Sequence, residues 1–279
     1  MAGGELGRRV AVAAVGIPIV LGAIWLGGWA FGALLAGAAV IATAELYGLA
    51  AAQGVRAFTA PGMAASGAMV LLATALPTPA AAGAALFAVL IAVALGSLAA
   101  SVWRRWPAGE PLSSVAITLM GPVYVGGTLA FAIFLRSLPA LGFVLLPLLT
   151  TWAGDSAAYF AGRAWGKAKL FPHASPGKTV VGGVACLIGS AVAGAVIAAV
   201  ALDDVPAASV SVSMGAFIGL VLGLTAPIGD VAESVLKREA GVKDSGRLLP
   251  GHGGFLDRID SLLFAFPVAY GLLVLLRVV

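Results

Sequence analysis

The sequence has little charge, one cysteine and two histidines. Only 10% of its residues are charged and 61% are apolar, whereas soluble domains carry about 25% charged residues. That apolar excess excludes a water-soluble globular fold and intrinsic disorder. The lone Cys186 excludes an intramolecular disulfide framework, and the sequence has no Cys/His cluster for zinc. With a mean hydropathy of +1.07, the chain is predicted to be an all-α polytopic integral membrane protein.

Long apolar runs are what the sequence has in abundance. A bilayer core about 30 Å thick needs roughly 20 apolar residues per helix. Glycine and proline breaks separate nine such runs, and eight or ten spans are the alternatives. The third run is short and rich in glycine and alanine, so it is also compatible with a tilted or re-entrant segment. The predicted spans are 10–27, 30–51, 62–77, 82–102, 113–136, 139–162, 180–201, 210–229 and 260–277.

The distribution of cations predicts the orientation of these spans. If the N-terminus is cytoplasmic, 14 of the 16 Lys and Arg residues fall on the inner side, and only Arg136 and Arg277 fall on the outer side. Cytoplasmic segments are enriched in Lys and Arg. We therefore expect a multi-pass protein of the cell inner (plasma) membrane with an active site facing the cytoplasm; an organelle membrane is the alternative.

Glycines at four-residue spacing mark one helix face. Gly215, Gly219 and Gly223 lie in the predicted span 210–229. Small residues at this spacing let helix backbones approach closely in membranes. Helix packing within the chain is the favoured interpretation, and a homodimer seam is the second one.

Reactive side chains are unevenly distributed along the chain. Residues 1–112 are mostly apolar spans with short connectors and are interpreted as an N-terminal scaffold of transmembrane helices. Residues 113–279 contain two polar inner loops, at about 163–179 and 230–259, and are interpreted as the catalytic region.

The second polar loop combines carboxylates, cations and glycines. On a helix, Asp230, Glu233 and Lys237 would share one face, and Asp257 and Asp260 would share another. Carboxylates suit Mg²⁺, which usually also takes substrate phosphate oxygens, and Lys and Arg neutralise phosphate charge. Gly251, Gly253 and Gly254 would let backbone amides approach an anion. Helix capping is the favoured explanation for any single carboxylate, but it does not explain carboxylates, cations and a glycine-flanked histidine together, so the loop is predicted to bind a metal and a polyphosphate.

These residues form an ordered series. The motifs Ser-x-x-Lys-Arg, Lys-Asp, His-Gly-Gly and Asp-Arg-x-Asp occur as Ser234–Arg238, Lys243-Asp244, His252–Gly254 and Asp257–Asp260. A second segment precedes them and contains Asp155, Ala158-Tyr159, Gly162-Arg163, Gly166-Lys167, Pro172, Ser175-Pro176, Lys178 and Thr179. Together they closely resemble the signature of the phosphatidate cytidylyltransferase (CDP-diacylglycerol synthase) family. The resemblance extends over most of the chain, and its motifs lie in the second half.

The resemblance implies the reaction of CTP with phosphatidate to give CDP-diacylglycerol and diphosphate in phospholipid biosynthesis. The implied cofactor is Mg²⁺, with a second metal ion left open, and the implied partners are CTP, the lipid and the membrane, with no nucleic acid. Asp230 and Asp257 are the expected principal metal ligands, with Asp260 ligating directly or through another group. The expected catalytic residues are Asp230, Lys237, Arg238, Asp257 and Asp260. The expected substrate-binding residues are Asp155, Ser175, Lys178, Thr179, Ser234, Lys243, Asp244, His252, Gly253 and Arg258.

Two positions depart from the family pattern. The family commonly has a second lysine where Gly177 lies and a glutamate where Val181 lies. Losing a cation and a carboxylate beside a nucleotide could weaken CTP binding or alter the metal dependence, but Lys178 and Thr179 keep the core of the motif, so activity is expected to be retained. Gly177-Lys178-Thr179 also resembles the end of a P-loop, but that motif requires a glycine where Pro172 lies and a preceding strand, which an all-helical chain is not expected to have.

Some single residues keep two interpretations. Asp155 and Glu45 lie inside predicted spans, where a carboxylate is costly and suggests function, yet a packing hydrogen bond is the alternative. His252 is interpreted as a mobile contact to substrate phosphate, with general-base catalysis as the alternative. Trp103 and Trp106 flank a pair of arginines and are interpreted as an interfacial anchor.

Two other functions compete with the cytidylyltransferase. Another CTP-using membrane enzyme, such as a polyprenol kinase or an archaeal-type lipid cytidylyltransferase, is the nearest. A transporter would use the intramembrane acids as an ion path, but we find no clear internal repeat of the kind transporters often have.

Overall fold

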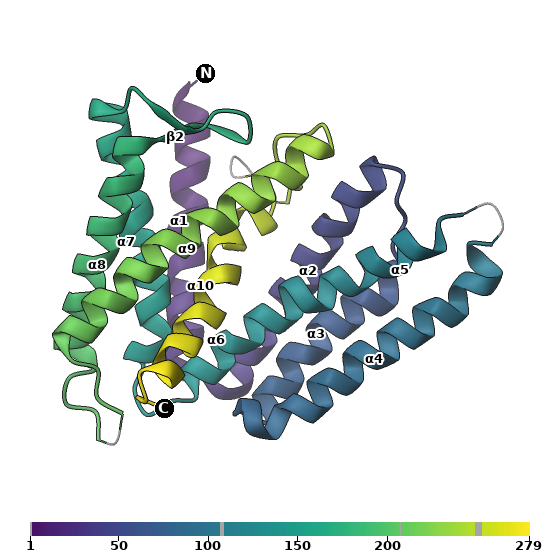
Figure 1. Cartoon of the computed structure of the whole chain (residues 1–279), viewed down its shortest axis with the longest axis horizontal. Helices are drawn as coiled ribbons and strands as arrows, with labels where there is room; N and C mark the ends of the chain where they lie inside the picture. The colour runs from purple at the N-terminus through teal and green to yellow at the C-terminus, as the bar shows by residue number, and fades with distance from the viewer. Residues whose placement is uncertain (1, 107–108, 207, 249–252) are drawn as a thin grey trace. The chain divides into compact units, whose positions relative to one another are not determined.

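The computed structural model describes residues 2–106, 109–206, 208–248 and 253–279. Helices dominate these residues, and the only strands among them form a two-stranded hairpin (Figure 1). The chain folds into two units. Unit 1 comprises Met1–Phe134 and Glu239–Ile259, and unit 2 comprises Leu135–Arg238 and Asp260–Val279. The predicted functional division after residue 112 is a separate matter and stays a prediction.

Unit 1 contains the N-terminal helices. They are α1 (Ala2–Leu26), α2 (Gly28–Ala52), α3 (Thr59–Ala75), α4 (Pro79–Arg104), α5 (Pro111–Met120), the π-helix η1 (Gly121–Gly127) and α6 (Thr128–Arg136), whose last two residues belong to unit 2. The start of α4 follows from local sequence, because the Thr78 side chain accepts a hydrogen bond from the Ala81 amide and Pro79 begins the helix. Pro122 has no amide hydrogen to donate, and the helix widens to π geometry around it.

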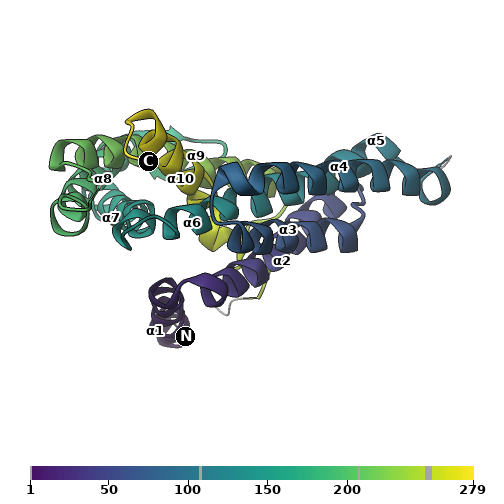
Figure 2. The ribbon, with the colours of Figure 1, turned by 90° about the horizontal axis from the view of Figure 1, so that it is seen from below.

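Small residues and buried hydroxyls hold the helices of unit 1 together. Helix α3 lies between α2 and α4, as the two views of the ribbon show (Figure 2). The Tyr47 hydroxyl donates a 2.6 Å hydrogen bond to the carbonyl oxygen of Thr118, joining α2 to α5. A Cβ atom at Gly62 or Gly121 would collide with the Tyr47 ring. The phenol therefore reaches its partner only because both neighbours are glycine.

Unit 2 contains the remaining helices and the hairpin. Its elements are α7 (Gly142–Trp165), β1 (Lys169–Phe171), β2 (Ser175–Thr179), α8 (Val180–Ala201), α9 (Val212–Glu239) and α10 (Leu256–Leu275). The last residue of α9 and the first four of α10 belong to unit 1. The strands are antiparallel, with Lys169 opposite Thr179 and Phe171 opposite Ser175. Thr179 caps α8, since its hydroxyl oxygen accepts a 3.1 Å hydrogen bond from the Gly182 amide.

The glycine face of α9 packs against α8, as predicted. A Cβ atom on Gly223 would come within 2.9 Å of the Ser190 Cβ, and one on Gly219 would overlap the Ser190 carbonyl oxygen. Gly215 lies in the same way against Gly194. These three glycines are therefore used within the chain, and the homodimer seam stays an untested alternative.

Six helices of the described residues are long and apolar enough to cross a membrane. They are α2, α4, the continuous helix from α5 to α6, α8, α9 and α10. These six helices confirm the prediction of a largely α-helical polytopic membrane protein. Helices α1, α3 and α7 lie over the other three predicted ranges, and a count of nine spans stays a prediction.

Two local expectations were wrong. The inner loop at 163–179 contains the β1–β2 hairpin, so the chain is not purely helical. The predicted loop at 230–259 begins with three turns of helix, because α9 continues to Glu239. Polar side chains four residues apart along this extension contact one another, as Glu233 and Lys237 do, and such pairs stabilise a helix beyond its apolar part.

Candidate active site

A pocket of about 630 Å³ lies within unit 2. Its walls come from the end of α7, the hairpin, the start of α8 and the middle of α9. The polar and charged residues among its walls are Asp155, Tyr159, Arg163, Lys169, Ser175, Lys178, Thr179 and Asp230. A pocket with this many converging polar groups is the default candidate for a binding site.

An ion pair joins the two motif segments inside this pocket. Lys178 Nζ of β2 lies 2.7 Å from Asp230 Oδ2 of α9, and the two side chains are 22% and 36% exposed. The Ser234 hydroxyl lies one helical turn further along α9 and contacts Asp230 Oδ1 at 3.4 Å. Asp155 of α7 lines the same pocket. The structure thus brings together four predicted site residues from three separate elements, α7, β2 and α9.

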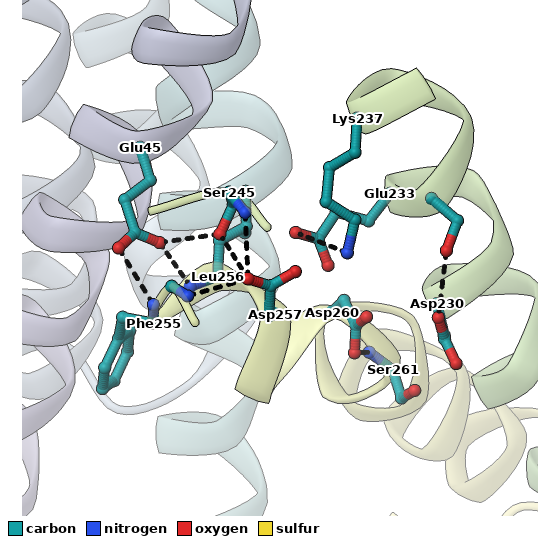
Figure 3. Close-up of polar contacts among 12 residues, drawn as sticks. Glu45, Asp230, Glu233, Lys237, Ser245, Phe255, Leu256, Asp257, Asp260 and Ser261 are labelled. Atoms are coloured by element: carbon teal, nitrogen blue, oxygen red, sulfur yellow. Dashed lines mark hydrogen bonds and ion pairs between the residues drawn. The ribbon is translucent and has the colours of Figure 1, made fainter. Parts of the chain in front are cut away.

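A second, buried charge pair lies further along α9 in unit 2. Lys237 Nζ is 3.6 Å from Glu233 Oε1 (Figure 3), and the Glu233 side chain is fully buried. Asp260 of α10 is also buried; its Oδ1 accepts a 2.6 Å hydrogen bond from the Ser261 amide. Its carboxyl group also interacts with the Glu233 side chain and, more weakly, with the charges of Asp230 and Lys237. Removing charges from water costs several kcal/mol per ion, so a buried pair of this kind is weak evidence for stabilisation of the fold.

Gly229 allows α10 to approach the charged part of α9. A Cβ atom on Gly229 would lie 2.6 Å from the Asp260 carbonyl oxygen and 2.9 Å from the Phe264 ring. The residue immediately before Asp230 therefore has to be small for Asp260 to lie where it does.

The predicted residue Asp257 belongs to a separate cluster in unit 1. Its Oδ2 atom accepts hydrogen bonds from the amides of Ser245 and Gly254, at 2.9 and 2.8 Å, and lies 3.1 Å from the Ser245 hydroxyl (Figure 3). The Gly254 amide, one of those predicted to approach an anion, donates its hydrogen to the Asp257 carboxylate of the chain itself, and binding of a substrate anion there stays a prediction. The neighbouring Gly253 has a φ of 82°, which favours glycine.

Glu45 of α2 completes this cluster and was not among the predicted site residues. Its Oε1 accepts a 3.0 Å hydrogen bond from the Phe255 amide, and its Oε2 accepts one of 2.8 Å from the Leu256 amide. The Ser245 hydroxyl lies 3.0 Å from the same Oε2. The available signal was a single carboxylate in a long apolar run, and that signal says nothing about its partners.

Most of the other predicted residues are exposed, and one lies outside the residues that the structure describes. Arg238, Lys243, Asp244 and Arg258 are exposed. His252 lies outside the described residues. Gly177-Lys178-Thr179 belongs to strand β2 rather than to a loop, so the rejection of a P-loop stands although its expected absence of strands was wrong. Tyr159, Arg163 and Lys169 line the pocket but were not predicted as site residues.

The carboxylates of unit 2 can be compared with the ligand sets that Mg²⁺ uses in proteins. Among the described residues, no three His, Cys, Asp or Glu side chains come close enough to form a metal cage. Mg²⁺ is commonly bound through one or two carboxylates together with water and substrate phosphates. Asp230 lines the pocket, and Gly229 beside it packs against the Asp260 backbone, so these two carboxylates of unit 2 would be the donors of such a site.

The chain belongs to the cytidylyltransferase family. The model of this family matches residues 7–276. A phosphatidate cytidylyltransferase of Synechocystis is 31% identical over 297 aligned positions, which cover 96% of this chain and 97% of that protein. One of Bacillus subtilis is 36% identical over 193 residues, covering 68% of this chain and 67% of the relative. The match to one of Staphylococcus saprophyticus is 40% over 159 residues, or 57% of this chain and 59% of the relative.

Proposed function

We propose that this protein is a phosphatidate cytidylyltransferase that converts CTP and phosphatidate to CDP-diacylglycerol and diphosphate. The observation that carries the proposal is the 2.7 Å ion pair between Lys178 and Asp230 in one pocket. It joins the two motif segments that resemble this family. The family match over most of the chain and the names of the relatives support the same activity.

The reaction is one displacement at phosphorus. An oxygen of the phosphatidate phosphate forms a bond to the α-phosphorus of CTP, and the bond between the α-phosphorus and the oxygen bridging to the β-phosphorus breaks. Diphosphate leaves with that oxygen. Because the attacking phosphate is already an anion, it needs no strong general base. The main requirements are in-line positioning and neutralisation of charge.

The pocket residues meet these requirements in distinct ways. Lys178, Arg163 and Lys169 provide positive charge at the walls of the pocket, where phosphate groups carry negative charge. Asp230 orients the Lys178 ammonium through their ion pair. Ser175 provides a hydroxyl group that can donate to a phosphate oxygen, and Thr179 holds the start of α8 in place.

Asp230 and Asp260 are the residues of unit 2 that would hold Mg²⁺. The bound ion would neutralise charge on the attacking and leaving oxygens. Asp257 stays a predicted ligand; its Oδ2 is engaged by Ser245 and Gly254.

The proposal includes a membrane orientation. The N-terminus faces the cytoplasm, nine helices span the inner (plasma) membrane, and the pocket opens toward the cytoplasmic side. The lipid reaches the pocket from the inner leaflet, and CTP reaches it from the cytoplasm. The positive-inside distribution of Lys and Arg supports this arrangement.

The test is a transfer assay with purified protein. Detergent-solubilised protein is incubated with phosphatidate, CTP labelled in its α-phosphate and Mg²⁺, and label in the lipid phase is measured with diphosphate release. We expect the two products in equal amounts, and we expect EDTA to abolish both. CDP formation with an isoprenoid alcohol would indicate a kinase instead. No turnover of CTP with any lipid would contradict the proposed function.

A further inference from the structure

Two carboxylates accept hydrogen bonds from the backbone amides at the start of helix α10. The first amide groups of a helix have no partner within the helix. Here Glu45 accepts the hydrogens of Phe255, which precedes α10, and Leu256, which is its first residue. Asp257 accepts that of Gly254. Both acids lie at the positive end of the helix dipole, where negative charge is favoured.

Glu45 is unusual among these groups because it comes from far away in the sequence. It lies on α2 and contacts the segment before α10 across about 200 residues of chain, as the separations of 200 to 211 residues in these hydrogen bonds show. Its two oxygens contact three donors, and Ser245 lies between Glu45 and Asp257. Gly246 and Gly254 have no room for a side chain beside the Glu45 carboxylate. Glycine at positions 246 and 254 therefore leaves the space that the Glu45 carboxylate fills.

We infer that Glu45 is a positioning residue that holds the Asp-Arg-x-Asp motif for the reaction by capping α10 from helix α2. This inference rests on the proposed function, since it assigns the capped motif to that reaction. Asp257, Arg258 and Asp260 follow the capped residues directly in the same helix. Their side chains are placed by where the helix begins and by its rotation about its axis. Glu45 fixes both, because its carboxylate oxygens hold two consecutive amides.

Both carboxylate oxygens of Glu45 have to be hydrogen-bond acceptors, because each accepts a hydrogen bond from a different backbone amide. Glutamine at position 45 would keep one acceptor oxygen but would present an NH₂ group where the second oxygen now accepts. One of the two amides would then lose its acceptor. Alanine would remove both acceptors, leaving both amides without one. Glu45→Ala is therefore expected to disturb the start of α10 more than Glu45→Gln does.

The experiment compares Glu45→Gln and Glu45→Ala with a matched control, Glu110→Gln. Glu110 also lies at the start of a helix, α5, but its side chain makes no capping hydrogen bond. Two readouts are taken on the full-length protein in detergent: kcat and KM for CTP, and amide hydrogen exchange of the segment 253–260. Thermal unfolding of each variant measures whether the protein is folded.

For Glu45→Gln we expect kcat to fall about 10- to 100-fold with little change in the KM for CTP, because misplaced groups slow the chemical step. Exchange in the segment 253–260 should rise, and Glu110→Gln should match the wild type in both readouts. A kcat per folded molecule equal to that of the control would overturn the inference. So would unchanged exchange at the start of α10.

The exchange readout separates this inference from the proposed function. If the wild type turns over no CTP, the proposed function fails, and exchange still reports whether Glu45 caps α10. If the wild type is active and Glu45→Gln only lowers the unfolding temperature, Glu45 is a structural brace and the inference is wrong. If Glu45→Ala does not fold, Glu45→Gln alone decides the outcome.

Discussion

Asp230 forms the polar contact that joins two distant parts of unit 2. It pairs with Lys178 at 2.7 Å and is also contacted by Ser234. Both members of the ion pair are partly exposed to the pocket, and exposed pairs add only about 0–1 kcal/mol to stability. The pair is therefore better explained by the chemistry of the pocket than by the stability of the fold.

Replacing Asp230 with asparagine should abolish activity without unfolding the protein. We expect a decrease in kcat of about 100-fold or more, because the variant loses a charge that orients Lys178 and that would hold the metal. The unfolding temperature should stay close to that of the wild type. Asp204→Asn, which changes an exposed acid in the same unit, is the matched control. Activity within about threefold of the wild type would refute the role assigned to Asp230.

Gly177 is the position where the family commonly has a second lysine. It lies in strand β2, lines the pocket, and has no atom within 4 Å of an added Cβ. A lysine therefore fits there, and its ammonium would add positive charge beside the proposed nucleotide site.

Gly177→Lys should lower the KM for CTP by about two- to fivefold at low salt, because opposite charges attract more strongly when screening is weak. His173→Lys adds a cation between the two strands but outside the lining of the pocket. This control should leave the KM unchanged. A KM that does not respond to Gly177→Lys, or a decrease that persists at 1 M salt, would argue against a phosphate at this wall of the pocket.

At the scale of whole elements, the packing of α8 against α9 depends on glycine. The Ser190 backbone and side chain lie where side chains on Gly219 and Gly223 would project. This close approach keeps α9, which carries Asp230, next to α8, which begins directly after the strand that carries Lys178. Helix packing and site geometry are therefore coupled.

Gly219→Ala should destabilise unit 2 by about 1–3 kcal/mol, since overpacking a tight interface forces the backbones apart. Gly271→Ala in α10 is the matched control, because nothing lies within 4 Å of its added Cβ. Thermal unfolding in detergent measures both variants. Equal unfolding temperatures for the two variants would show that the α8–α9 contact tolerates a methyl group.

The orientation of the whole molecule follows from the proposed membrane topology. Single-cysteine variants test it in a background of Cys186→Ser, which removes the only native thiol. We expect a membrane-impermeant maleimide added to intact cells to label Asp204→Cys, on the predicted outer side. Lys169→Cys, in the hairpin, should be labelled only after the cells are opened. Labelling of the hairpin variant in intact cells would reverse the orientation.

The sequence was informative wherever a property depends on neighbouring residues. Apolar runs are local, and helices lie over all the predicted ranges in the described part of the chain. Charges at helical spacing along 230–239 indicated a shared face, and Glu233 and Lys237 do contact each other. The hairpin was missed, because strands as short as Lys169–Phe171 carry little periodicity.

The amino-acid sequence by itself determined that this is a helical membrane protein with its reactive groups in two polar segments, because hydropathy and motif spacing are read along the chain. Only the tertiary structure decided which of those groups meet. The pairing of Lys178 with Asp230 and the capping of α10 by Glu45 depend on how elements distant in sequence pack. The fold also places the Asp257 Oδ2 atom beside the backbone amides of Ser245 and Gly254. A carboxylate binds whichever donors the fold places beside it, and this choice leaves no local pattern in the sequence.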